Sequence, residues 1–300
     1  MTRTAAAELC EGVAYVYDGS LEGMLSAIFA AYANHEDPDD IVAAGQVQPR
    51  LGQRIASIQT DMRHAERVAR TLRDRCGWKA YCAVRDAALF EGEGAATAAY
   101  RFVRYALDLH KRRDCAHCRK RASCAGARGS GPCARLAGRA LSDITHPAVQ
   151  PLHRIQRSVF VECEHVRQFA RFEHLRGQGA DLWFARCNPK AAVVPLVMDH
   201  FVDRFSIQPF ILYDEAHGIA GVYEGAGWHL VRTEGLGELA LPGHAEEERL
   251  MQAAWRRFYQ AVAVESRYNP ELRQHFMPKR FWRNLTEMQQ EVPTALARTP

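Results

Sequence analysis

The chain of 300 residues lacks any run of about 18 consecutive apolar residues, which is the length that a membrane-spanning helix needs. Its first residues, Met-Thr-Arg-Thr-Ala-Ala-Ala-Glu, also lack the apolar core of a signal peptide. We therefore expect no membrane association and a cytoplasmic location.

Several motifs of known chemistry are absent as well. The chain has no Gly-x4-Gly-Lys-Ser/Thr phosphate loop, no Gly-x-Gly-x-x-Gly dinucleotide fingerprint and no His-Glu-x-x-His motif. It also lacks the Cys-x3-Cys-x2-Cys motif of radical-SAM enzymes. These absences argue against catalysis through a nucleotide-binding loop or a zinc-protease site.

The positive charge of the chain is concentrated in one segment. Residues 101–139 carry a net charge of +9, whereas the whole chain carries +4, so the remainder sums to −5. Such a localised positive charge is typical of a surface that binds nucleic acid. Since 47% of the residues are apolar, the chain can bury a substantial core in one large domain or two modest ones. Of these we expect a single domain over residues 1–300.

Four of the nine cysteines lie in this basic segment, in a Cys-x2-Cys-x5-Cys-x8-Cys array. A reducing compartment and the odd total argue against disulfides. Four thiolates suit a structural Zn²⁺ ion, although the second pair is spaced more widely than a zinc knuckle. The alternatives are a four-iron four-sulfur (4Fe-4S) cluster and a loop of reduced thiols without metal. The expected ligands are Cys115, Cys118, Cys124 and Cys133.

The periodicity of apolar residues predicts an α+β fold. Alternation of period two predicts strands over residues 13–17, 169–174, 181–186, 210–213, 219–223 and 228–231. Helical periodicity predicts helices over residues 21–32, 55–72, 78–90, 95–113, 149–166, 191–205 and 246–264. Residues 41–51 are expected to be a connector, and residues 125–138 an irregular loop. We expect a mixed or mostly antiparallel sheet with flanking helices.

Several collinear blocks of the sequence carry a resemblance to a known family. The blocks are Tyr15–Gly23, Pro38–Ile41, Phe169–Phe172, Pro195–Phe205, Gln208–Asp214, Arg267–Pro270 and Met277–Trp282. Together they resemble a bacterial family that is predicted to act in DNA repair or DNA metabolism and whose own biochemical activity is unassigned. The resemblance spans roughly residues 13–285.

The resemblance implies a set of partners. Members of the family are typically encoded beside a radical-SAM protein of DNA modification or repair, and some are fused to a uracil-DNA glycosylase-like domain. It therefore implies DNA, a radical-SAM protein and a uracil-DNA glycosylase-like protein as partners. Most members pass directly from the helix near Lys111 to the segment near Leu141, so residues 114–138 resemble a Cys-rich, metal-binding insertion of a subgroup.

Two groups of residues are candidates for catalysis. Asp18 directly precedes a predicted helix, where a carboxylate acts as a base or stabilises the positive helix end. His200, Asp203 and Arg204 lie within about one helical turn and combine groups that bind phosphate and transfer a proton. An ion pair at a helix end explains Asp203 and Arg204 equally well.

Nine basic residues are candidates for contacts with nucleic acid. Six of them lie within eleven positions, where a polyanion would relieve their mutual repulsion. The others alternate with aromatic residues, a combination that stacks on bases or contacts phosphate, although half-buried aromatics in a sheet show the same alternation. The set is Lys111, Arg112, Arg113, Arg119, Lys120, Arg121, Arg171, Arg280 and Arg283.

The leading hypothesis is a nucleic-acid-associated accessory factor of DNA repair or DNA metabolism that acts with a radical-SAM partner. One alternative is an enzyme that acts on a damaged base or nucleotide through Asp18, His200 and Arg204. Another is an iron-sulfur redox protein that supplies electrons to the partner through the cysteine quartet.

Metal analysis of protein purified without oxygen tests the hypotheses for the quartet. We expect a colourless protein with about one zinc ion per chain, held by four thiolates. A brown protein with thiolate-to-iron absorbance would support the iron-sulfur cluster instead. Stoichiometric zinc in a colourless protein would exclude the redox hypothesis.

Overall fold

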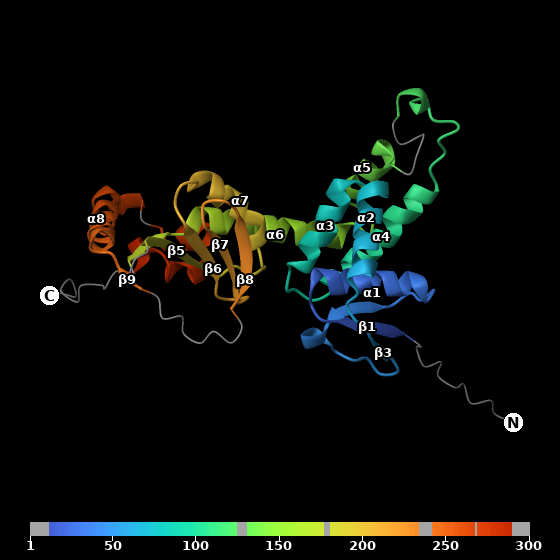
Figure 1. Ribbon diagram of the computed structural model, residues 1–300, viewed down its shortest axis with the longest axis horizontal. Coiled ribbons are helices and arrows are strands. Elements are labelled where there is room, and N and C mark those ends of the chain that lie inside the picture. Colours follow the sequence, from blue (N-terminus) through green and yellow to red (C-terminus); the bar gives the residue numbers. More distant parts are fainter. Residues whose placement is uncertain (1–11, 125–130, 177–180, 234–241, 268, 290–300) are drawn as a thin grey trace. The chain divides into compact units, whose positions relative to one another are not determined.

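The computed structural model describes residues 12–124, 131–176, 181–233, 242–267 and 269–289 (Figure 1). The chain divides into two compact units, an N-terminal unit of residues 1–159 and a C-terminal unit of residues 160–300. Helices combine with two sheets, which confirms the α+β class. The single domain over residues 1–300 stays a prediction. Among the described residues, no helix combines the length and the apolar character that a membrane crossing requires.

A parallel sheet of three strands forms one side of the N-terminal unit, in the order β2-β1-β3. Its strands are β1 (Val13–Tyr17), β2 (Asp40–Ala43) and β3 (Arg54–Ser57). Tyr15 pairs with Ile41 on one side and with Ala56 on the other. Thr97 covers the edge strand, because its hydroxyl accepts a hydrogen bond from the backbone N–H of Ile41 (2.9 Å) and donates one to the carbonyl of the same residue (3.2 Å).

This sheet corrects two expectations from the sequence. Residues 41–51 are not merely a connector, because β2 includes residues 41–43. The helix expected over residues 55–72 begins only at Met62, because Ile55 belongs to β3. Pairing with β1 decides both segments, and the strands are too short for their apolar pattern to distinguish them from a loop or a helix.

Five helices pack together in the N-terminal unit: α1 (Leu21–Ala33), α2 (Met62–Arg75), α3 (Trp78–Ala88), α4 (Ala95–Lys111) and α5 (Ala134–Ser142). α1 contacts β1 and also lies against α2 (Figure 1). The Asp61 carboxylate caps α2 by accepting hydrogen bonds from the N–H groups of Arg63 and His64. The irregular loop expected up to residue 138 is wrong for residues 134–138, which are helical, and residues 125–130 lie outside the described residues.

The C-terminal unit contains a sheet of six strands in the order β8-β7-β6-β5-β4-β9. The pair β5–β6 is parallel and the other pairs are antiparallel, so the sheet is mixed, as expected. The strands are β4 (Glu173–Arg176), β5 (Asp181–Cys187), β6 (Phe210–Asp214), β7 (Ile219–Tyr223), β8 (Trp228–Arg232) and β9 (Gly243–His244). The strand expected from residue 169 begins only at Glu173, because α6 continues to Phe169.

Helices complete the C-terminal unit. α7 (Val194–Arg204) connects the parallel strands β5 and β6 and packs on β7 through its buried side chains. α6 (Gln150–Phe169) includes the boundary between the two units. The remaining helices are α8 (Glu246–Val262), α9 (Pro270–Phe276) and α10 (Lys279–Trp282).

The contact between α7 and β7 requires a glycine at position 221. A Cβ atom added to Gly221 would lie 2.3 Å from Sδ of Met198, whose side chain is fully buried. We expect Gly221→Ala to lower the free energy of unfolding by about 1–3 kcal/mol, as overpacked cores do. A Cβ atom on Gly227 meets nothing within 4 Å, so Gly227→Ala is the matched control. Urea unfolding measures both, and equal stability of the two variants would contradict this packing.

Candidate nucleic-acid interface

Asp18 lies at the carboxyl end of the parallel sheet, in the turn between β1 and α1. Its carboxylate accepts hydrogen bonds from the backbone N–H of Ser20 (2.9 Å), the hydroxyl of Ser20 (2.6 Å) and the hydroxyl of Thr60 (2.7 Å). Ser20 also caps α1 by accepting a hydrogen bond from the N–H of Gly23 (2.9 Å). Since β2 and β3 lie on opposite sides of β1, this turn is the switch point of the sheet, where open α/β sheets commonly bind ligands.

These hydrogen bonds determine the charge of Asp18. Burial favours the neutral acid, but the hydrogen bonds from Ser20 and Thr60 outweigh it and lower the pKa of Asp18. A carboxylate with a lowered pKa is a poor general base near neutral pH. The geometry therefore supports the structural role of Asp18 more strongly than the catalytic one.

His200, Asp203 and Arg204 lie near the end of α7, and all three side chains are exposed. Within the described ranges, no hydrogen bond or ion pair joins any two of them. His200 packs against the edge of Phe201, and Arg204 lies over the ring of Phe205. Asp18 belongs to the N-terminal unit, so a catalytic site that includes all four residues stays a prediction.

Carboxylates of the C-terminal unit engage the three arginines that were expected to bind nucleic acid there. Arg171 pairs with Glu287 (2.9 Å), and Arg283 pairs with Glu215. Arg280 pairs with Glu162 (2.6 Å), whose side chain is buried. These pairs give the three guanidinium groups a role in the fold, and their contacts with phosphate stay predictions.

The four cysteines of the expected metal site are partly exposed and form no disulfide bond: Cys115, Cys118, Cys124 and Cys133. In the parts of the chain that the structure describes, no three Cys, His, Asp or Glu side chains come together as metal ligands. Asp114 shapes the turn at the first cysteine pair, since it accepts hydrogen bonds from the N–H groups of Ala116 and His117. The Zn²⁺ site, its 4Fe-4S alternative and the insertion over residues 114–138 stay predictions.

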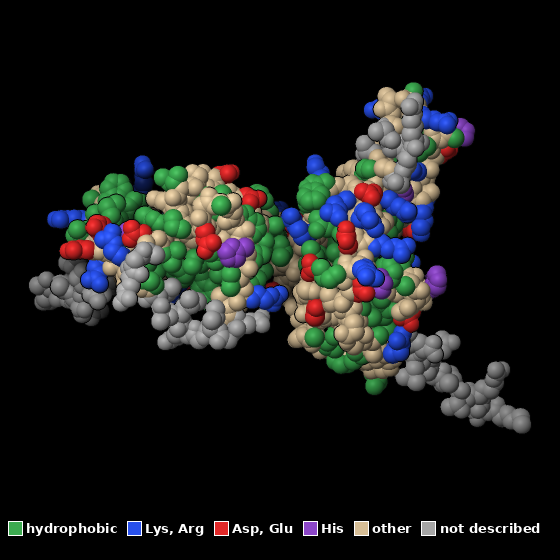
Figure 2. All heavy atoms as spheres, viewed as in Figure 1, with side chains coloured by type: hydrophobic (Ala, Val, Ile, Leu, Met, Phe, Trp, Pro, Cys, Tyr) green, Lys and Arg blue, Asp and Glu red, His purple; other side chains and the backbone are tan. Residues whose placement is uncertain are grey.

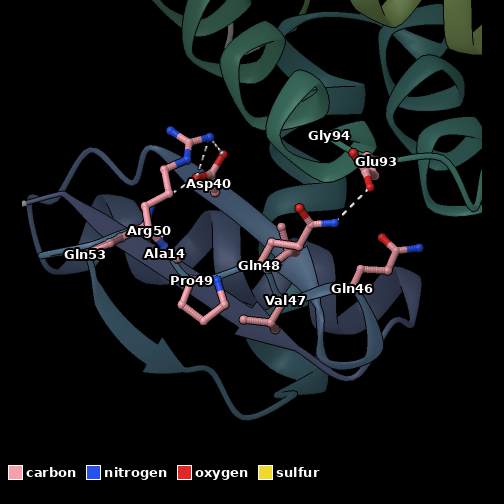
Figure 3. A pocket seen from close by; sticks show the side chains of 11 residues that line it. Ala14, Asp40, Gln46, Val47, Gln48, Pro49, Arg50, Gln53, Glu93 and Gly94 are labelled. Atoms are coloured by element: carbon pink, nitrogen blue, oxygen red, sulfur yellow. Dashed lines mark hydrogen bonds and ion pairs between the residues drawn. The ribbon is translucent and has the colours of Figure 1, made fainter.

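A pocket of about 440 Å³ lies beside β2, between the sheet and the segment that leads to β3 (Figure 3). At one end Arg50 pairs with Asp40 (3.2 Å). At the other end Gln48 donates a hydrogen bond to Glu93 (3.1 Å). Because these polar groups already satisfy one another, we do not assign a ligand to this pocket.

A second cavity, the α1–α2–α4 groove, has a volume of about 390 Å³ and lies between the three helices of that name. Its floor is apolar and includes Phe29 and Tyr32 of α1. Three basic side chains line it, Arg67 and Arg75 from α2 and Lys111 from α4. No Asp or Glu is among its lining residues. Figure 2 shows Lys and Arg side chains gathered over the surface where Figure 1 labels α2 and α4.

The positive charge of the groove is only partly compensated. Lys111 pairs with Asp108 (2.9 Å), an exposed contact that contributes little free energy. Among the described residues, neither Arg67 nor Arg75 forms an ion pair, and the guanidinium of Arg67 lies 5.7 Å from the ring of Phe29. Lys111 was predicted from the sequence, whereas both arginines were missed. Their spacing of eight residues along α2, beside its apolar stripe, is the signal that would have found them.

The sequence profile of one family, described as a domain of unknown function, DUF4130, matches residues 133–287. The chain belongs to this family. A comparison with curated proteins finds none that matches. The DUF4130 match confirms a family without assigned activity over residues 133–287. The DNA-repair role, the resemblance over residues 13–132, the radical-SAM neighbour and the glycosylase fusion stay predictions. The α1–α2–α4 groove lies before the matched residues, in the part of this DUF4130 protein that the profile does not cover.

Asp18→Asn tests the structural role of the carboxylate. An amide has one acceptor oxygen instead of two, so we expect the free energy of unfolding near neutral pH to fall by about 1 kcal/mol. Because the folded-state pKa is lowered, the difference between wild type and variant is complete above the unfolded pKa of about 3.9. It disappears as the pH falls through the lower folded-state pKa.

Urea unfolding at a series of pH values measures this difference. Asp203→Asn is the control, because Asp203 is exposed and forms no ion pair with the described residues. A stability difference that does not change with pH would contradict the role assigned to the Asp18 hydrogen bonds.

Proposed function

We propose that this DUF4130 protein is a nucleic-acid-associated accessory factor of DNA repair or DNA metabolism that binds DNA through its N-terminal unit. The observation that carries the proposal is the α1–α2–α4 groove, where Arg67, Arg75 and Lys111 surround an apolar floor without acidic lining residues. Cations held close together repel one another, and a phosphate backbone relieves that repulsion and releases counterions when it binds.

The surroundings of the groove support the same assignment. α2 carries five arginines against Glu66 and Asp74. Beyond Lys111 the chain continues with exposed basic residues, Arg112, Arg119, Lys120 and Arg121, while Arg113 donates a hydrogen bond to the carbonyl of Gly131 (3.0 Å). The basic segment that the sequence predicted and the arginines of α2 therefore belong to the same compact unit.

An accessory role fits the described geometry better than an enzymatic one. Asp18 has a lowered pKa, and His200 forms no hydrogen bond with a neighbouring acid or base among the described residues. Neither arrangement provides for proton transfer. The resemblance of the collinear sequence blocks supports a radical-SAM protein as the partner that supplies the chemistry, and a uracil-DNA glycosylase-like protein as a second partner.

Fluorescence anisotropy with a labelled oligonucleotide tests DNA binding by the N-terminal unit. We expect the logarithm of the binding constant to fall linearly with the logarithm of the salt concentration, by about 0.7–0.9 for each phosphate contacted. The triple variant Arg67→Gln, Arg75→Gln and Lys111→Gln should bind more weakly and reduce that slope by roughly one for each phosphate that is no longer neutralised.

The control variant is Arg249→Gln with Arg257→Gln, two exposed arginines on α8 of the C-terminal unit. It removes charge outside the groove and should bind as the wild type does. Binding that responds neither to salt nor to the groove charges would overturn the proposed function.

A further inference from the structure

We infer that the α1–α2–α4 groove binds an unpaired nucleotide, whose base stacks on Tyr32 and whose flanking phosphates contact Arg67, Arg75 and Lys111. The N-terminal unit would accordingly prefer single-stranded DNA, or a duplex with an extruded base, over intact duplex DNA. This inference rests on the proposed function and names the form of nucleic acid that the same site takes.

Tyr32 provides the stacking surface. Its side chain is 37% exposed, whereas Phe29, on the same face of α1, already stacks on His64 with ring centroids 3.9 Å apart. Every base has a π-face that an aromatic ring can cover, so stacking of this kind tolerates any sequence. A tyrosine phenol is neutral near pH 7 and does not repel phosphate, and burial raises the pKa of Tyr32 further.

Two hollows of different polarity border Tyr32. The groove lies on one side, and its charged lining residues are Arg67, Arg75 and Lys111. A third cavity of about 300 Å³ lies on the other, where Asp37 pairs with Arg104 (2.6 Å) and Glu36 is a further carboxylate of the lining, which also includes Lys111. Carboxylates repel phosphate, so the backbone of a bound strand would follow the α2 side of the ring.

The basic side chains on that side, Arg67, Arg75 and Lys111, are spread along the groove and are called the cation track below. Arg67 and Arg75 are separated by eight residues of α2, a rise of about 12 Å. Lys111 lines the same groove from α4. A cation track of this length contacts successive phosphates of a strand, whereas a single small anion would use only one end of it.

Intact duplex DNA can contact the basic side chains of the groove but not stack a base on Tyr32. Its bases are stacked and paired, so a protein must extrude a base, at a cost of a few kcal/mol, before an aromatic side chain can stack on it. The apolar floor of the groove would then stay exposed to water beside a duplex. An unpaired base covers that floor without this cost, and the groove therefore favours the unpaired form.

Anisotropy with a single-stranded oligonucleotide and with the duplex of the same sequence tests the inference. We expect Tyr32→Ala to weaken single-strand binding by about 5- to 150-fold, the loss that corresponds to one stacked base. Duplex binding and the salt slope should stay unchanged, because no charge is removed. Tyr32→Phe keeps the ring and should keep the affinity.

Trp78→Ala is the matched control, because Trp78 is an exposed aromatic residue on α3 that does not line the groove. It should bind both forms as the wild type does. Thermal unfolding of Tyr32→Ala shows whether weaker binding comes from the lost ring or from an unfolded protein. If the alanine variant is unstable, the affinity of Tyr32→Phe for the single strand is the test, because a loss of affinity with the ring still present would contradict stacking.

The outcomes separate the two proposals. Salt-dependent DNA binding that Tyr32→Ala leaves intact for the single strand would overturn the inference and preserve the proposed function. If the protein binds neither form of DNA but binds an acidic helical peptide in this groove, both proposals fail. Stronger binding of the single strand that depends on the Tyr32 ring supports both.

Discussion

The parallel pairing of β1 with β2 on one side and β3 on the other is the constraint on which the N-terminal unit depends. It places Asp18 and Thr60 at the same edge of the sheet, where their side chains share a hydrogen bond (2.7 Å). α1 and α2 begin just beyond this edge and pack side by side. Tyr32 on α1 and Arg67 on α2 consequently reach one groove, although they lie far apart in the sequence.

Arginine residues of this protein have two different roles. In the C-terminal unit, Arg280 and Arg171 pair with the buried carboxylates of Glu162 and Glu287. Removing one partner of such a pair is strongly destabilising, because it leaves an uncompensated charge in the interior. Arg67 and Arg75 of the N-terminal unit form no such pair among the described residues, so they remain available to a polyanion. An arginine that pairs with a buried carboxylate stabilises the fold, whereas an arginine without such a partner can bind a ligand. The number of arginines alone does not distinguish these roles.

Strongly periodic segments of the sequence were predictable. The apolar stripe of α1 and the alternation in β5, β6 and β7 correspond closely to the observed elements, because burial on one face imposes those periods. β2 and β3 were missed, because each has only four residues and β3 is largely exposed. Their hydrogen-bond partners lie on β1, which is distant in the sequence, so the pattern of apolar residues within each strand does not predict the pairing.

The sequence by itself determined the α+β class, the concentration of positive charge in residues 101–139 and the presence of Lys111 in it, since composition and periodicity are local properties. Only the tertiary structure decided which cations share a surface with an aromatic ring. It paired Arg280 with a buried carboxylate and placed Arg75 in one groove with Tyr32 and Lys111. The physical reason is that helix packing brings together side chains from segments that are distant in the chain, and the neighbours of a charge determine what it can bind.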